Sequence, residues 1–133
     1  MFLRWLEKED QERFIELAYK TLMVDSVYDD SEKILFQEFK QETGISSPGN
    51  TGTLEDLLNY FGGKDSVTQK IVLFETCSML LTDGPANAKE NDFLEFAKGK
   101  FQISEDEIKA IIASAEEVAS NVMKARKLIG IGL

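Results

Sequence analysis

Two ten-residue stretches of the chain carry the same pattern of acidic side chains. MVDSVYDDSE begins at Met23 and LTDGPANAKE begins at Leu81, and in each an aspartate stands third and a glutamate tenth. Carboxylate oxygens are the preferred ligands of hard divalent cations, which take about six to eight oxygen ligands. The pattern therefore predicts a cation site at two acidic turns. Its candidate ligands are Asp25, Asp29, Asp30, Glu32, Asp83 and Glu90.

The same acids have a second interpretation as helix caps. Asp29 and Glu32, and likewise Asn87 and Glu90, have the spacing of a helix cap and its third helical residue. A glutamate in that position accepts a backbone N–H and favours the positive end of the helix dipole, and each effect is worth roughly 0.5–1 kcal/mol. The aspartates that stand third in the two stretches then accept backbone N–H groups where the preceding helices end. The residues alone leave both interpretations open.

The paired acidic turns are not EF-hand loops. An EF-hand needs a glutamate ligand at the twelfth position of its loop. The twelfth residue counted from Asp25 is Phe36, and counted from Asp83 it is Leu94. Neither side chain carries an oxygen, so this calcium-binding motif is excluded.

The amino-acid composition excludes several kinds of catalytic and metal site. The 133 residues include no histidine and one cysteine, Cys77. Nucleophile–histidine pairs, histidine-containing zinc or di-iron sites, thiolate clusters and intrachain disulfides are therefore excluded. Calcium, magnesium and manganese are the cations that suit the remaining oxygen ligands. Because no phosphate-binding loop or cofactor motif is present either, we expect no enzymatic activity.

An excess of acidic residues limits the kinds of partner. The formal net charge is −9. Nucleic acid requires a basic surface, so we expect no nucleic-acid binding, and cations or basic protein surfaces are favoured instead. The apolar run from Ile71 to Leu81 is too short to span a bilayer and contains Glu75, so no direct membrane insertion is expected. The first ten residues become charged before a signal-peptide core forms, which indicates a cytoplasmic location.

The spacing of apolar residues predicts an all-α fold of about six helices in one domain, residues 1–133. Apolar side chains recur every three or four residues within the segments, and no stretch alternates as a strand does. The fourth helix is apolar on nearly all sides, so it should be the central element. The expected helices run through residues 11–24, from Asp29 or Asp30 to Gly44, from Thr53 to Phe61, from Ser66, from Asn87, and from Ser104 to about residue 129.

Capping boxes mark the start of three of these helices. A capping box pairs the residue before a helix with an acidic or amide residue three positions later. The three pairs are Thr53 with Asp56, Ser66 with Gln69, and Ser104 with Glu107.

Basic residues crowd the last turn of the final helix. Lys124, Arg126 and Lys127 stand there. Their simplest role is to complement the negative end of the helix dipole. The alternative is a basic patch that docks a partner.

The two acidic stretches belong to a longer repeat. A shift of 58 residues places Asp25 on Asp83 and Glu32 on Glu90, since 83 − 25 and 90 − 32 are both 58. We therefore expect one helix–turn–helix unit to occur twice, at about residues 14–46 and 72–104, in a compact bundle with a C-terminal helix at about 104–129. The same shift pairs the apolar residues Ile15 with Leu73, Tyr19 with Cys77, Leu35 with Phe93, and Phe36 with Leu94.

Residues 3–128 resemble the bacterial tellurite-resistance TerB-like family. The resemblance is carried by FLRWLEKEDQERFIELAYKTLMVDSVYDDSEK and KIVLFETCSMLLTDGPANAKENDFLEFAK, which follow the family's N-terminal helix and its two A-D-G-x-x-x-x-x-E turns. It implies an all-α fold of two helical repeats, a stress-response setting and a metal-binding role for the acidic turns. The first turn departs from the pattern, because Val24 and Ser26 replace the alanine and the glycine. In the second turn Thr82 replaces the alanine, and Pro85 stiffens the chain.

Two functions follow as expectations. The first is a small acidic TerB-like module in stress response that acts by protein interaction and by divalent-cation binding at the two turns. The alternative is a metal-free protein–protein adaptor in which the turns are only helix caps. Exposed side chains at Phe2, Trp5 or Tyr28 would support the adaptor, because apolar aromatic surface left in solvent marks an interaction site.

Overall fold

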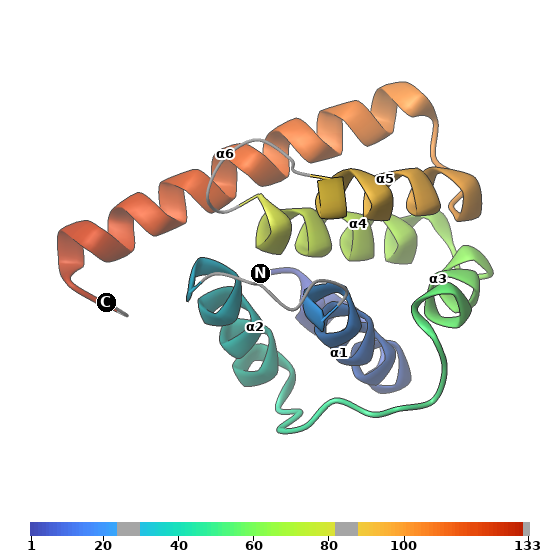
Figure 1. Ribbon diagram of the computed structural model, residues 1–133, viewed down its shortest axis with the longest axis horizontal. Coiled ribbons are helices and arrows are strands. Elements are labelled where there is room, and N and C mark those ends of the chain that lie inside the picture. Colours follow the sequence, from blue (N-terminus) through green and yellow to red (C-terminus); the bar gives the residue numbers. More distant parts are fainter. Residues whose placement is uncertain (24–29, 82–87, 132–133) are drawn as a thin grey trace.

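The computed structural model describes residues 1–23, 30–81 and 88–131, and every regular element within these ranges is a helix. This confirms the prediction of an all-α fold with about six helices (Figure 1). None of the described helices has the length and apolar character needed to cross a bilayer. The elements are a short 3-10 turn, η1 (Leu3–Trp5), followed by α1 (Lys8–Met23), α2 (Asp30–Thr43), α3 (Leu54–Gly62), α4 (Ser66–Leu80), α5 (Ala88–Lys100) and α6 (Glu105–Ile129).

Helix α4 lies in the middle of the bundle. It packs against α2, α3 and α6, while α1 and α2 pack against each other below it in the view of Figure 1. Nine of its residues are buried. The prediction that the fourth helix is central is therefore confirmed. Its apolar contribution to the core consists of Val72, Leu73, Cys77, Met79 and Leu80.

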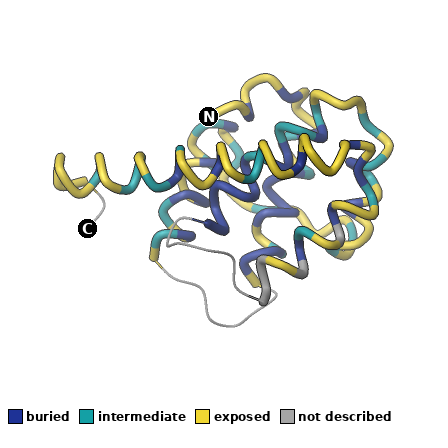
Figure 2. The backbone as a smooth tube through the Cα atoms, turned by 90° about the horizontal axis from the view of Figure 1, so that it is seen from above, coloured by how far each residue is buried: buried dark blue, intermediate teal, exposed yellow. Residues whose placement is uncertain are grey.

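Helix α6 is longer than the body that it covers. Its first turns pack along α4, and its C-terminal part projects past the other helices in both Figure 1 and Figure 2. One side of α6 faces the core, and Ile108, Ala115 and Ala119 are buried there. Gly130 ends the helix with a positive φ of 89°, a conformation that glycine adopts without steric cost.

Two of the three predicted caps are present. The Thr53 hydroxyl accepts the N–H of Asp56, and the Asp56 carboxylate accepts the N–H of Thr53, so this capping box is complete. The Ser104 hydroxyl accepts the N–H of Glu107 at the start of α6. Both caps satisfy backbone donors that the helices leave unpaired.

The predicted capping box at Ser66 and Gln69 is wrong. Asp65 is the cap of α4, and its Oδ1 accepts the Thr68 N–H at 2.8 Å. A carboxylate is a stronger acceptor than a hydroxyl, and Ser66 becomes the first helical residue. The spacing rule identified the right turn and placed the cap one residue too late.

Gln69 instead joins two loops that are far apart in sequence. Its side chain is 1% exposed, and its Nε2 lies 3.1 Å from the carbonyl oxygen of Gly62 and 3.1 Å from that of Lys64. Its Oε1 accepts the N–H of Gln102 at 3.0 Å. The α3–α4 connection is thereby fastened to the α5–α6 connection.

Positions related by the 58-residue shift behave alike in most places. Helices α2 and α5 begin at Asp30 and Ala88, which are 58 residues apart. Leu35 and its counterpart Phe93 are both buried. The duplication itself stays a prediction. One pair of core positions differs in chemistry, because Leu17 in α1 corresponds to Glu75 in α4.

Replacement of Gly62 by alanine should destabilise the fold. A Cβ atom at Gly62 would lie 2.6 Å from the backbone oxygen of Lys100, closer than such atoms approach in proteins. We expect Gly62→Ala to lower the free energy of unfolding by about 1–3 kcal/mol, measured by urea unfolding. The control is Gly99→Ala, because a Cβ there meets nothing within 4 Å and the helix gains about 0.5–1 kcal/mol of propensity. Equal effects of the two substitutions would contradict the close-approach argument.

Candidate functional site

For four of the six predicted cation ligands the structure describes no side chain. Asp25, Asp29 and Asp83 are outside the described residues, as is Tyr28. Glu90 belongs to α5, but its side chain is not described. Their arrangement in space therefore gives no support to either interpretation of the acidic turns.

The two remaining predicted ligands differ sharply in exposure. Asp30 opens α2 with a side chain 97% exposed, and its Oδ1 lies 3.8 Å from the Nζ of Lys33. Glu32, two residues later, is only 3% exposed. Residues 1–23, 30–81 and 88–131 contain no group of three His, Cys, Asp or Glu side chains placed to hold a metal ion. Cation binding at the turns remains a prediction.

A groove of about 580 Å³ lies between α2, α4 and α6. Three of the four side chains that α6 contributes to its lining, those of Val118, Ala119 and Val122, are short and leave much of this space unfilled. The lining is mainly apolar, with carboxylates from α2 and α4 and one arginine from α6. The apolar lining residues are Met1, Leu35, Phe39, Phe74, Val118, Ala119 and Val122, and the polar ones are Glu38, Gln41, Glu42, Glu75, Ser78 and Arg126.

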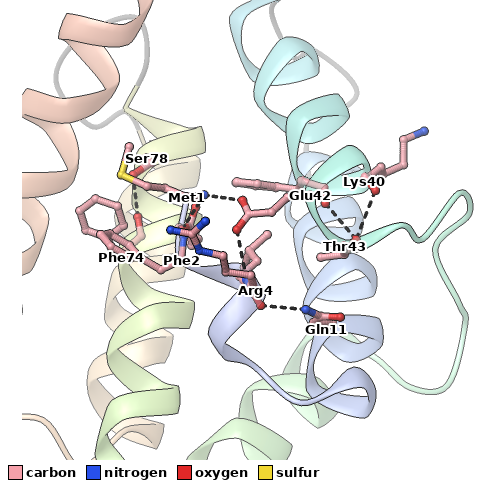
Figure 3. Close-up of polar contacts among 12 residues, drawn as sticks. Met1, Phe2, Arg4, Gln11, Lys40, Glu42, Thr43, Phe74 and Ser78 are labelled. Atoms are coloured by element: carbon pink, nitrogen blue, oxygen red, sulfur yellow. Dashed lines mark hydrogen bonds and ion pairs between the residues drawn. The ribbon is translucent and has the colours of Figure 1, made fainter.

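Two carboxylates hold the N-terminal residues at one side of the groove (Figure 3). Glu75 accepts the N–H of Phe2 at 2.6 Å, and its Oε1 lies 3.1 Å from the amino group of Met1. Glu42 lies 2.5 Å from the same amino group and accepts the N–H of Arg4 at 3.1 Å. The first four residues thus form a strap that links α4 to α2.

Glu75 is an unusual residue for a central helix. It is 2% exposed, and burial raises its pKa above the ordinary value. The positive amino group of Met1 and the N–H of Phe2 oppose this rise in pKa without cancelling it. A buried carboxylate requires such partners, because an unpaired charge in the interior is costly.

Arg126 connects α6 to α2 beyond the strap. Its Nη1 lies 2.8 Å from Oε1 of Glu38, and its side chain is 19% exposed. Its Nε is buried and has no hydrogen-bond partner among the described residues. The groove therefore has an acidic side on α2 and α4, and α6 contributes a single positive charge to its lining.

Glu16 forms a second buried carboxylate site, and its role there is structural. It is 1% exposed and accepts the N–H groups of Thr51 and Gly52 at 2.7 and 3.1 Å and the Thr51 hydroxyl at 2.6 Å. Burial alone raises the pKa of Glu16, but these donors and Lys20 outweigh it, so the net shift is downward. These contacts fasten the loop before α3 onto α1.

A third cluster, formed by Asp10, Tyr60 and Lys64, lies close to the exposed Trp5. Asp10 is 4% exposed, accepts the Tyr60 hydroxyl at 2.6 Å and lies 3.2 Å from Nζ of Lys64. Trp5 lines the adjoining hollow and is 72% exposed. Phe2 is 39% exposed, with its ring edge-on to Phe74. Both exposures are those that the adaptor alternative predicts.

Comparison with protein-family models, with curated proteins and with solved structures gives no match for this chain. The resemblance to the TerB-like family therefore stays a prediction. The groove between α2, α4 and α6 is the candidate site, and its description rests on geometry alone.

Sequence reasoning missed the acids of this groove. The sequence patterns gave no role to Glu42, and they marked Glu75 only as a charge within an apolar run. The available signal was the 58-residue shift, which aligns Glu75 with the apolar core residue Leu17. A carboxylate at a core position of a repeat requires a partner, and the strap provides it.

The two interpretations of the acidic turns predict different responses to cations. If the turns bind calcium, magnesium or manganese, that ion at about one hundred times its dissociation constant raises the free energy of unfolding by about 2.7 kcal/mol. The double variant Asp25→Asn/Glu32→Gln then loses this response. If the turns are caps, no ion shifts the melting temperature of the wild type, and the variant is only less stable. Thermal melts of both proteins with each ion distinguish these outcomes.

Glu75 should make the stability of the protein fall as the pH rises. Its pKa is raised in the folded state above the ordinary 4.5, so the folded protein binds more protons than the unfolded chain between these two values. We expect the wild type to lose stability relative to Glu75→Gln as the pH rises through this window. Urea unfolding of both proteins at a series of pH values from about 4 to 7 measures the difference.

Glu16→Gln is the control of opposite sign. Because the pKa of Glu16 is lowered in the folded state, its contribution is complete above the unfolded pKa and disappears as the pH falls through the folded pKa. The wild type should therefore gain stability relative to Glu16→Gln as the pH rises. If the difference in unfolding free energy between wild type and variant changed with pH in the same direction for Glu75→Gln and Glu16→Gln, the raised pKa of Glu75 would be refuted.

Proposed function

We propose that this protein is a small acidic interaction module that binds a basic amphipathic helix in the groove between α2, α4 and α6. The observation that carries the proposal is an apolar groove with carboxylates along one side. Amphipathic helices dock by placing their apolar face in such grooves. This develops the protein-interaction function expected from the sequence.

The apolar walls provide the contact area for such a helix. Phe74 of α4 and Val118 and Val122 of α6 are half-buried and line the groove. Leu35 and Phe39 of α2 form the facing wall. A volume of about 580 Å³ has room for several anchoring side chains.

The groove favours a basic partner because its three glutamates outnumber its two positive groups, Arg126 and the Met1 amino group. Glu38 of α2 is half exposed, and Glu42 lies beside it one turn further along the helix. The whole chain carries a net charge of −9, which speeds the approach of a positively charged partner. A partner with lysine or arginine beside its apolar face matches both features.

The finer expectations from the sequence belong to this proposal as well. The TerB-like resemblance adds a stress-response setting, and the charged N-terminal segment adds a cytoplasmic location. Neither Asp30 nor Glu32, the two predicted ligands whose side chains the structure describes, lines the groove, so cation binding at the acidic turns is a separate part of the proposal. We propose binding rather than catalysis, since both Glu42 and Glu75 are engaged by donors of the N-terminal strap.

A designed peptide tests the proposal. The probe is a fluorescent, end-capped helix of leucine and lysine with leucine on one face, and the readout is fluorescence anisotropy. We expect Val118→Asp to weaken binding by about tenfold or more, because the substitution removes an apolar contact. This loss should exceed the attraction between the new carboxylate and the lysines of the peptide. Ala113→Asp is the matched control: it adds the same charge at an exposed position of α6 that does not line the groove. Equal binding by both variants would contradict the proposal.

A further inference from the structure

We propose that the groove of one molecule receives the C-terminal end of α6 from a second copy, so that two chains pair through antiparallel α6 helices. This inference rests on the proposed function, since it names the partner of the same groove. It is drawn from the exposure, charge and register of α6.

The end of α6 leaves large apolar side chains in solvent. Leu128 is 89% exposed, Ile129 is 70% exposed and Ile131 is 47% exposed. They lie where α6 projects beyond the rest of the bundle (Figure 2). Several adjacent apolar side chains in solvent are typical of an interaction surface.

The same segment is basic, whereas the chain as a whole carries a net charge of −9. Lys124 and Lys127 are exposed and form no ion pair with any residue in the described ranges. They flank Arg126, which already pairs with Glu38 of its own chain. This favours the docking alternative for the basic cluster over a role confined to the helix dipole. The end of α6 is therefore a basic, apolar helical segment.

One face of α6 joins the groove to the exposed end. Val118, Val122, Ala125 and Ile129 follow one another at intervals of four, three and four residues, so they lie on one side of the helix. The first two line the groove, and the last two are exposed. The apolar stripe thus continues from the covered part of the helix into the uncovered part.

The apolar stripe selects the antiparallel direction. Val118 and Val122 line the groove, and Ala125 and Ile129 follow them toward the exposed end of the helix. In an antiparallel pair the exposed end of each stripe lies against the groove-lining part of the other, whereas a parallel pair sets the two exposed ends side by side. Ile129 then lies near Val118 of the second copy. Each copy both gives its helix end and receives one, so the assembly closes as a two-fold dimer.

Sedimentation over a wide concentration range tests the dimer with two matched variants of the full-length chain. Ile129→Asp should raise the dimer dissociation constant by about tenfold or more, because it places a charge in the apolar contact. Val67→Asp should leave it unchanged: Val67 is 66% exposed, close to the value for Ile129, but lies at the start of α4 away from the groove. Both positions are exposed in the single chain, so neither substitution disturbs the core.

Disulfide trapping tests the direction of pairing. A mixture of Val118→Cys and Ile129→Cys chains should cross-link on mild oxidation, whereas either variant alone should not. The wild type controls for Cys77, which is 1% exposed. Cross-linking of each variant with itself, but not of the mixture, would indicate parallel helices and overturn the antiparallel pairing.

The outcomes separate this inference from the proposed function. A wild type that stays monomeric at every concentration, or a dimer weakened by Val67→Asp and not by Ile129→Asp, overturns self-pairing through α6. If the leucine–lysine peptide still binds and Val118→Asp still prevents binding, the groove functions with another protein. If neither the peptide nor a second copy binds, the proposed function fails together with the inference.

Discussion

The burial of α4 on nearly all sides is the constraint on which the rest of the structure depends. Helices α2, α3 and α6 pack around it, so any polar group that α4 carries must find its partners inside the protein. Glu75 is such a group, and the N-terminal residues provide its donors. Because the same residues also reach Glu42, the strap joins α4 to α2 and forms one side of the groove. A single buried carboxylate thus determines where the N-terminal segment lies.

Local patterns predicted the helices well and one of their starts badly. Apolar spacing and the pairs at Thr53 and Ser104 depend on residues three or four positions apart, and the helix geometry makes these neighbours in space. Gln69 has the same spacing from Ser66, but its amide turns to the loop that contains Gln102. A spacing rule cannot foresee this, because the competing partner is 33 residues away. Tertiary packing decided between a local helix cap and a hydrogen bond to a distant loop.

The candidate site shows the same division between local and distant information. The acidic turns were visible in the sequence because their members lie within ten residues of each other. Glu42 and Glu75 are joined only by the packing of α2 on α4 and by the strap, so no local pattern reveals them. The predicted repeat offered partial information, since the 58-residue shift places Glu75 on Leu17. This alignment marks Glu75 as an exceptional core residue, and the structure shows that the N-terminal amino group and the Phe2 N–H stabilise its carboxylate.

The length of α6 gives one helix two roles. At about 1.5 Å per residue, its 25 residues extend about 37 Å, against about 22 Å for the 15 residues of α4, so α6 must overhang the helix that it covers. An overhang that faced only water would be most stable with polar residues throughout, as helix surfaces in solvent usually are. Here the stripe of Val118 and Val122 continues as Ala125 and Ile129 after α4 has ended. The overhang therefore has the amphipathic pattern of a helix that is packed on one side, and in the proposed dimer the second copy provides the surface that completes it.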